Sequence, residues 1–216
     1  MKRFLLLLSL CSLTNVYSQI IEHDWTRSFY SGGSSYTHTN GITLTDLGYV
    51  YSMHSFKDLC WGESDEIMFN SNGEEDIMIT KTSDNRTAMW EKQIGGPGLD
   101  YPDAIEQMSN GDIIVTGIFS DSVDFDPGID EEWRVSNGDV DNFILRLDEN
   151  GNYIDCQVFG GSGYSYINDL VVTENDEILV CGLFMDTMNL NLASQAEILV
   201  SDNGYTSFIS KFDNNL

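Results

Sequence analysis

The sequence repeats itself at a fixed offset of 65 in residue number, and a fixed period constrains the fold more than any other feature of a chain. Trp90–Gly96 returns as Asp155–Gly161, and the first glycines of the two copies give the offset (160 − 95 = 65). The same register continues without a gap through the pairs Tyr101 and Tyr166, Gly117 and Gly182, Phe143 and Phe208, and Asp148 and Asp213. This agreement predicts that the chain is built from copies of one structural unit.

A third and more divergent copy lies upstream. Trp25 precedes Trp90 at the same offset (90 − 25 = 65), whereas Gly48–Phe56 matches Gly111–Phe119 at an offset of 63 (111 − 48 = 63). We attribute the difference to a small length change in one turn. The chain therefore divides into an N-terminal segment, residues 1–18, and a repeat region, residues 19–216, with copies at residues 19–89, 90–154 and 155–216.

Each copy predicts four strands. In the middle copy we expect strands at residues 103–108, 112–119, 142–147 and 153–159, where apolar and β-branched residues gather between turns. Asn110-Gly111 and Asn150-Gly151 are typical hairpin turns, and no long stretch shows helical spacing. Four antiparallel strands per unit are typical of a propeller blade. The predicted fold is therefore all-β, with three four-stranded antiparallel blades of the β-propeller type. A β-helix is the structural alternative, although its coils are usually shorter.

The number of blades leaves three arrangements open. The third copy ends where its fourth strand would begin, and Asp24–Phe29 reads as an unattached strand of that kind. Propellers usually have about four to eight blades. We therefore expect a fragment of a larger propeller, with two alternatives. In one, two chains pair to complete a six-bladed ring, and in the other the three blades form an open arc.

Three motifs resemble the bacterial β-propeller repeat, or SBBP-type, family of secreted proteins. They lie at Trp90–Gly96, Asn110–Phe119 and Asp141–Gly151. The first copy departs from the pattern, because His54 stands where the other copies have a strand glycine. The resemblance implies a propeller fold and an extracellular or cell-surface location, and it implies no particular activity.

The N-terminal segment, residues 1–18, has the pattern of a signal peptide. Lys2 and Arg3 supply positive charge, residues 4–13 are almost wholly apolar, and Val16–Ser18 is a plausible cleavage site. The apolar run is too short for a membrane span, which needs about 20 residues. We therefore expect an exported product that is secreted, extracellular or attached to the cell surface, with the periplasm as a further location.

Removal of the signal peptide would leave three cysteines, Cys60, Cys156 and Cys181. Three thiols do not make a disulfide framework, even in an oxidising compartment. A single bridge between Cys156 and Cys181 and a set of isolated buried thiols both remain open.

The charge balance is strongly acidic. The chain has 35 Asp and Glu against 10 Lys and Arg, a formal charge of −25, and loss of Lys2 and Arg3 would leave 35 − 8 = 27 excess negative charges. A field of this sign repels phosphate backbones and anionic lipids. We therefore expect no nucleic-acid binding and no membrane insertion, and cations or basic partners are the favoured ligands. A hydrophobic fraction of 41% is sufficient for a folded core.

The connection between the second and third strands of the middle copy is a candidate metal site. Acids occupy almost half of the positions in residues 120–132. Asp124 and Asp126 would lie on one side of an extended chain, and with Asp121 they could supply hard oxygen ligands to calcium. The counterparts in the third copy, Asp186, Asn189 and Asn191, keep the oxygens and lose charge. The alternative is a solvated acidic loop.

No motif in the sequence names a reaction. The histidines, His23, His38 and His54, all lie in the divergent first copy and lack metal-ligand spacing. We therefore predict a non-catalytic binding or structural module whose ligand is an unknown protein or carbohydrate. The alternative function is a glycan-active hydrolase on a propeller scaffold, which would need two placed carboxyl groups.

Overall fold

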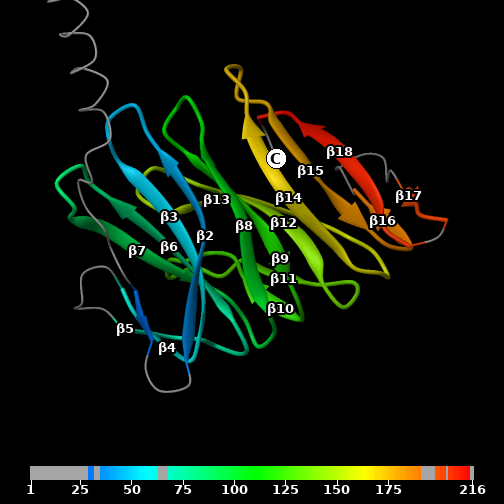
Figure 1. Cartoon of the computed structure of the whole chain (residues 1–216), viewed down its shortest axis with the longest axis horizontal. Helices are drawn as coiled ribbons and strands as arrows, with labels where there is room; N and C mark the ends of the chain where they lie inside the picture. The colour runs from blue at the N-terminus through cyan, green and yellow to red at the C-terminus, as the bar shows by residue number, and fades with distance from the viewer. Residues whose placement is uncertain (1–28, 32–34, 63–67, 191–197, 203, 215–216) are drawn as a thin grey trace, which may run out of the picture.

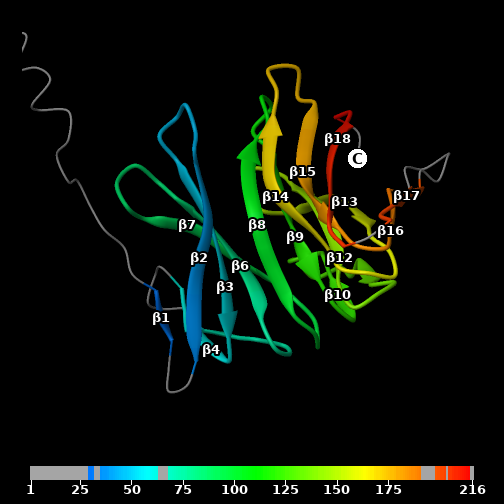
Figure 2. The same ribbon diagram turned by 45° about the vertical axis from the view of Figure 1, so that its right-hand side comes forward.

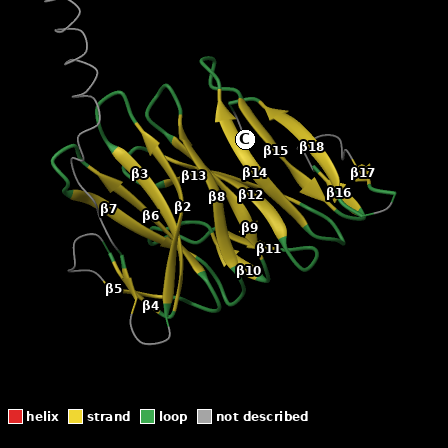
Figure 3. Cartoon of the chain, viewed as in Figure 1, coloured by secondary structure: helices red, strands yellow, loops and turns green. Residues whose placement is uncertain are grey.

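The computed structural model describes residues 29–31, 35–62, 68–190, 198–202 and 204–214 (Figure 1). The predicted signal peptide and most of the predicted strand Asp24–Phe29 lie outside these residues, as do His23, Trp25 and Asn191. All regular secondary structure in the described part is β-strand, and the strands of each sheet pair antiparallel (Figure 3). The predicted all-β class is confirmed.

Three main sheets follow one another along the chain. In each, consecutive strands of the sheet are hydrogen-bonded neighbours. The first sheet contains β2 (Tyr36–Leu44), β3 (Val50–Lys57), β6 (Asp76–Thr82) and β7 (Ala88–Ile94). The second contains β8 (Asp100–Gln107), β9 (Ile113–Phe119), β12 (Asp141–Leu147) and β13 (Tyr153–Phe159). The third contains β14 (Ser165–Val172), β15 (Ile178–Phe184) and β18 (Thr206–Phe212).

A small hairpin interrupts each sheet between its second and third strands. These hairpins are β4 (Leu59–Trp61) with β5 (Met68–Asn70), β10 (Ser122–Asp124) with β11 (Trp133–Val135), and β16 (Thr187–Asn189) with β17 (Ile198–Val200). Strand β1 (Tyr30–Ser31) pairs with β4. The sequence does not predict the hairpins as strands, because such short strands inside polar connections carry too brief an alternation to read.

The strand positions have the spacing found in the sequence. The first residues of β9 and β15 differ by 65 in number (178 − 113 = 65), as do those of β12 and β18 (206 − 141 = 65). The first residues of β3 and β9 differ by 63 (113 − 50 = 63), whereas those of β6 and β12 differ by 65 (141 − 76 = 65). Because Trp25 and Trp90 also differ by 65, the offset changes once before β3 and changes back between β3 and β6.

The three sheets stand side by side in a row, and the described residues do not close the row into a ring (Figure 2). The first strands, β2, β8 and β14, are neighbours in space, with β8 in the middle. Side chains of β9 alternate between two cores, so Ile113 and Val115 face the first sheet while Ile114 faces the third. The second sheet is consequently buried on both faces.

Glycines at one strand position reflect this close packing. A Cβ at Gly117 would lie 2.2 Å from the carbonyl oxygen of Tyr101, and a Cβ at Gly182 would lie 2.1 Å from that of Tyr166. His54 occupies the matching place in the first sheet. Its ring nitrogens are hydrogen-bonded to Thr39 and Ser52, at 3.1 and 3.0 Å, and burial lowers its pKa to about 4.

Cys60, Cys156 and Cys181 are free thiols in the structure, which resolves the open question of a Cys156–Cys181 bridge in favour of isolated thiols. Cys60 and Cys156 are buried, and burial raises the pKa of both, to about 11 for Cys60. Both are therefore poor nucleophiles at neutral pH.

Candidate functional site

The turns that follow the first strand of each sheet lie at one end of the molecule, the upper end in Figure 1, and border a hollow of about 530 Å³. We call it the turn hollow. Its charged lining residues are Asp46, Lys81, Glu106, Glu149, Glu174 and Asp176. Each of the three sheets contributes to it, so the hollow exists only because the sheets stand in a row.

The three turns share one backbone conformation. Gly48 and Gly111 have φ values of 82° and 95°, and Asp176 has a φ of 60° at the corresponding position. In each turn the N–H of this residue donates to the carbonyl of the residue that begins the turn, as Gly111 does to Met108 at 3.0 Å. Glycine adopts this left-handed conformation without strain, and Asp is among the few other residues that tolerate it.

Hydrogen bonds between neighbouring turns hold the shape of the hollow. The Asp176 carboxylate accepts hydrogen bonds from the backbone N–H of Ser109, at 2.7 Å, and from its hydroxyl. These bonds lower the pKa of Asp176. On the other side, the Thr43 hydroxyl donates to Glu106 Oε2 at 3.3 Å. The second sheet is thereby tied to both of its neighbours at this end.

Lys81 is the one cation among the described lining residues, and its ammonium group is already engaged. Its side chain comes from β6, and the residue is only 5% exposed. Nζ donates to the backbone carbonyl of Glu149 at 2.9 Å and lies over the rings of Tyr49 and Tyr51, at 4.8 and 5.2 Å from their centroids. Trp90 Nε1 donates to the same carbonyl at 3.1 Å. Lys81 therefore joins the first sheet to the β12–β13 turn.

The electrostatic character of the hollow follows from this arrangement. Five carboxyl-bearing side chains border it, against the single ammonium group of Lys81. Like charges around a hollow reinforce one another and raise the local concentration of counter-charged ligands. The turn hollow is therefore suited to a cationic group.

The predicted calcium ligands lie elsewhere, in the connection of residues 120–135, which we call the acidic hairpin. Asp121 has a φ of 63°, and its carbonyl accepts the N–H of Ser136 at 2.8 Å. Asp58 and Asp186 repeat this geometry in the other two hairpins, with φ values of 59° and 58°. Asp121 therefore shapes the base of the hairpin.

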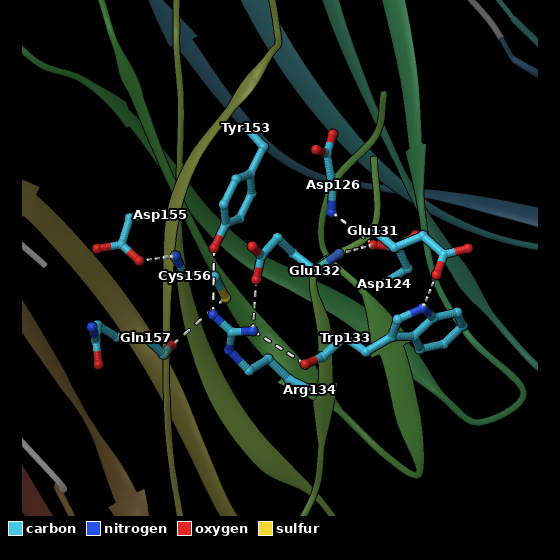
Figure 4. Close-up of polar contacts among 10 residues, drawn as sticks. All are labelled: Asp124, Asp126, Glu131, Glu132, Trp133, Arg134, Tyr153, Asp155, Cys156 and Gln157. Carbon is cyan, nitrogen blue, oxygen red and sulfur yellow. Dashed lines mark hydrogen bonds and ion pairs between the residues drawn. The ribbon is translucent and has the colours of Figure 1, made fainter. Parts of the chain in front are cut away.

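The carboxylates of Asp124 and Asp126 accept hydrogen bonds from the backbone of the same loop, and Figure 4 shows those of Asp124. Asp124 Oδ1 accepts from the N–H groups of Asp126 and Glu132, at 3.1 and 2.8 Å, and Asp126 Oδ1 accepts from Gly128 at 2.7 Å. In the part of the chain that the structure describes, no three His, Cys, Asp or Glu side chains gather as a metal site would require. Calcium binding by Asp121, Asp124 and Asp126 stays a prediction.

The same hairpin exposes aromatic and aliphatic surface. Trp133 is half exposed, and its Nε1 donates to Glu131 at 3.2 Å (Figure 4). Arg134 donates to Glu132 at 3.0 Å and to the Tyr153 hydroxyl at 3.4 Å, beside a second hollow of about 300 Å³. The bond to Tyr153 joins the hairpin to β13, so the hairpin is a second ligand-accessible surface with an ordered scaffold.

Two carboxyl groups of β8 have strongly raised pKa values. Burial raises the pKa of Asp100 to about 8 and that of Asp103 to about 7. Asp100 Oδ2 accepts the N–H of Gly96 at 2.7 Å, whereas its Oδ1 and the Oδ2 of Asp103 have no hydrogen-bond partner among the described residues. Neither residue lines the two hollows described above.

Sequence reasoning missed the turn hollow. The Asn110-Gly111 turn is recognisable, yet nothing in a turn sequence says that three such turns converge. Lys81 carried a usable signal, since Arg146 and Lys211 occupy the same position in the next two copies (146 − 81 = 65; 211 − 146 = 65). A basic residue at one position of every copy indicates a repeated contact between copies.

No protein-family model matches the chain, and no curated protein is significantly similar to it. Fold and site together define an all-β protein of antiparallel sheets with an acidic hollow at one end. Among its described residues there is no helix with the length and apolar character that crossing a membrane demands.

Proposed function

We propose that the chain is an exported, non-catalytic binding or structural module of the β-propeller type, and that its turn hollow holds a basic segment of a partner protein. The propeller assignment is supported by three like sheets in a row whose first strands are adjacent, an arrangement typical of consecutive blades. The assignment to a secreted or cell-surface location rests on the pattern of residues 1–18 and on the resemblance to the SBBP-type repeat.

The negative charge of the turn hollow indicates the class of ligand. Its one described cation, Lys81, is buried against two tyrosine rings and a carbonyl group. The acidic side chains are therefore the charged groups that a ligand in the hollow would contact. Lysine and arginine side chains of a protein partner fit a hollow of this sign.

Peptide binding to residues 19–216 tests this function. Fluorescence anisotropy would compare a lysine-rich peptide with a peptide in which glutamine replaces lysine. We expect the lysine-rich peptide to bind and the neutral one not to bind. A double variant, Glu106→Gln with Glu174→Gln, should weaken binding about tenfold, which corresponds to about 1.4 kcal/mol.

The matched control removes the same charge from the acidic hairpin, by Asp130→Asn with Glu131→Gln. This variant should bind the lysine-rich peptide within about twofold of the unmodified chain, because its charges lie away from the hollow. Equal losses in both variants would show nonspecific attraction and would contradict the proposal. Binding of neutral oligosaccharides in place of the peptide would contradict it as well.

A further inference from the structure

The three turns that border the turn hollow share a backbone conformation and differ in their side chains. Before the left-handed residue, the second and third copies have Asn110 and Asn175, and the first copy has Leu47 (110 − 47 = 63; 175 − 110 = 65). Asn110 Oδ1 accepts the N–H of Asp112 at 3.0 Å, so this asparagine helps to close its own turn. Leu47 has no group that could accept such a bond, and its side chain is 78% exposed.

The first turn does not need Leu47 in order to form. The Thr45 hydroxyl oxygen accepts the N–H of Tyr49 at 3.0 Å, and the Thr45 carbonyl accepts that of Gly48 at 3.0 Å. Thr173 makes the same two contacts in the third turn, at 3.1 and 2.9 Å, with asparagine at the position that matches Leu47. The hydrogen bonds of the first turn are therefore compatible with a polar residue in place of this leucine.

Leu44, the last residue of β2, adds to the apolar surface of the hollow. It is 71% exposed and lines the hollow together with Leu47. Its counterparts are Gln107, which donates to the carbonyl of Gly111 at 3.2 Å, and Val172, which packs against the core of the third sheet. A single exposed leucine is normal on a protein surface, whereas two that border one hollow offer a ligand a place to bury apolar atoms. We call Leu44 and Leu47 the leucine rim.

A second difference removes a carboxyl group from the first turn. Tyr49 occupies the position of Asp112 and Glu177 (112 − 49 = 63; 177 − 112 = 65). Asp112 forms an ion pair with Arg146 at 2.6 Å, and Glu177 forms the equivalent ion pair of the third sheet at 2.8 Å. In the first sheet, Lys81 lies over the Tyr49 ring instead. An aromatic ring thus stands where the other two turns have a carboxylate.

The apolar and acidic parts of the lining come from different sheets. The turn after β8 lies between the turn after β2 and the turn after β14 (Figure 1). The first turn contributes one acid to the lining, Asp46, and the other acids, Glu106, Glu149, Glu174 and Asp176, come from the second and third sheets. The leucine rim is therefore at the side of the first sheet, and most of the negative charge is at the side of the other two.

We propose that the partner segment in the turn hollow is amphipathic, with a large apolar side chain on Leu44 and Leu47 and basic side chains on the carboxyl groups of the second and third sheets. This inference rests on the proposed function and adds an apolar requirement to it. The negative charge attracts and orients the segment, and burial of apolar surface on the leucine rim adds affinity. The rim thereby selects among basic segments that the charge alone would attract equally.

Fluorescence anisotropy with peptides of equal charge tests this inference. One peptide alternates lysine with glycine, and in a second peptide leucine replaces two of the glycines. We expect the leucine-containing peptide to bind the unmodified chain about tenfold more tightly. Equal affinity of the two peptides overturns the inference and leaves the proposed function standing. If neither peptide binds, both the proposed function and the inference are overturned.

Removal of the leucine rim tests the location of the apolar contact. Leu44→Gln with Leu47→Asn gives the first turn the residues of the second turn, so we expect the same far-ultraviolet circular dichroism as for the unmodified chain. The two lysine peptides should bind this variant within about twofold of each other. The lysine and glycine peptide should bind it as it binds the unmodified chain, because the carboxyl groups are unchanged. A preference for leucine that survives in the double variant overturns the inference.

The matched control changes two exposed apolar residues outside the hollow. Ile129→Gln with Val135→Thr alters the acidic hairpin, where Ile129 is fully exposed and Val135 is 66% exposed. This variant should keep the full preference for the leucine-containing peptide. Loss of the preference in the control would show that exposed apolar surface in general selects the peptide, and it would overturn the assignment to the leucine rim.

Discussion

The second and third sheets are built from the same strands and differ in what covers them. Ile144 and Ile209 occupy equivalent places, and only Ile144 is buried. The third sheet keeps the apolar outer residues of a middle sheet, although water reaches them in the single chain. The difference teaches that burial in a row of sheets depends on position in the row, so that the same apolar residue is part of a core in one sheet and exposed in another.

The largest difference in the free energy of unfolding should come from truncating Ile144 in the second sheet and Ile209 in the third. Ile144→Ala removes buried methyl groups and leaves a cavity, so we expect a loss of about 2–5 kcal/mol in the free energy of unfolding. Ile209→Ala should cost less than about 1 kcal/mol, because the Ile209 side chain is exposed. Urea unfolding measures both, and equal losses would break the comparison.

A second difference between the sheets concerns Asp103, whose counterpart in the third sheet is Asn168 (168 − 103 = 65). Burial raises the folded-state pKa of Asp103 to about 7, above its value in the unfolded chain. The stability linked to this group is therefore full below about pH 4 and falls as the pH rises to about 7. Asp103→Asn should gain about 4 kcal/mol at pH 8, at about 1.4 kcal/mol per pKa unit, and gain nothing at about pH 4.

Thermal and urea unfolding at the two pH values measure this change. Asn168→Asp is the matched variant for the third sheet, and it should lose less than Asp103→Asn gains, because Asn168 is exposed. A gain for Asp103→Asn that is the same at both pH values would contradict the assignment of a protonated carboxyl group.

The basic residues at the sheet boundaries provide the third test. Lys81→Met removes a buried donor from the carbonyl of Glu149, and we expect a loss of about 1–3 kcal/mol. Lys211→Met removes an exposed ion pair with Glu177, which is worth about 0–1 kcal/mol. Urea unfolding measures both values, and a larger loss for Lys211→Met than for Lys81→Met would contradict this reading of the two contacts.

The smallest effect concerns the acidic hairpin and its counterpart in the third sheet. Asp124→Ala removes the acceptor of two backbone N–H groups, so we expect a loss of about 1 kcal/mol that is equal in calcium and in a chelator. Thermal unfolding measures it, with Asn189→Ala as the matched change in β16. Calcium-dependent stabilisation that disappears in Asp124→Ala would instead support the predicted metal site.

Much of the fold could be predicted from the sequence because the information is local or periodic. The repeat offset locates the main strands, and Tyr153–Phe159 has the predicted bounds. Strand β8 begins at Asp100, earlier than the predicted residue 103, because Asp100 is polar yet buried at the strand end. Burial of that kind depends on the neighbouring sheet, which a local pattern does not describe.

The candidate site was harder to predict for the same reason. The sequence places Asp124 and Asp126 in the correct loop, but their role as backbone acceptors depends on the loop conformation. The turn hollow depends on three segments that are far apart in the sequence. The hydrogen bond from Lys81 to the Glu149 carbonyl depends on contact between two sheets. Identical turn sequences on separated sheets would form no hollow.

The account rests on burial being set by the place of a strand in the row of sheets. In the part of the chain that the structure describes, β12 lies between β9 and β13, whereas β18 is at the edge of its sheet. Hydrogen exchange of the backbone amides of β12, compared with those of β18, tests this claim most directly. We expect the amides of β12 to be protected and those amides of β18 that face away from β15 to exchange rapidly, and equal protection of the two strands would contradict the account.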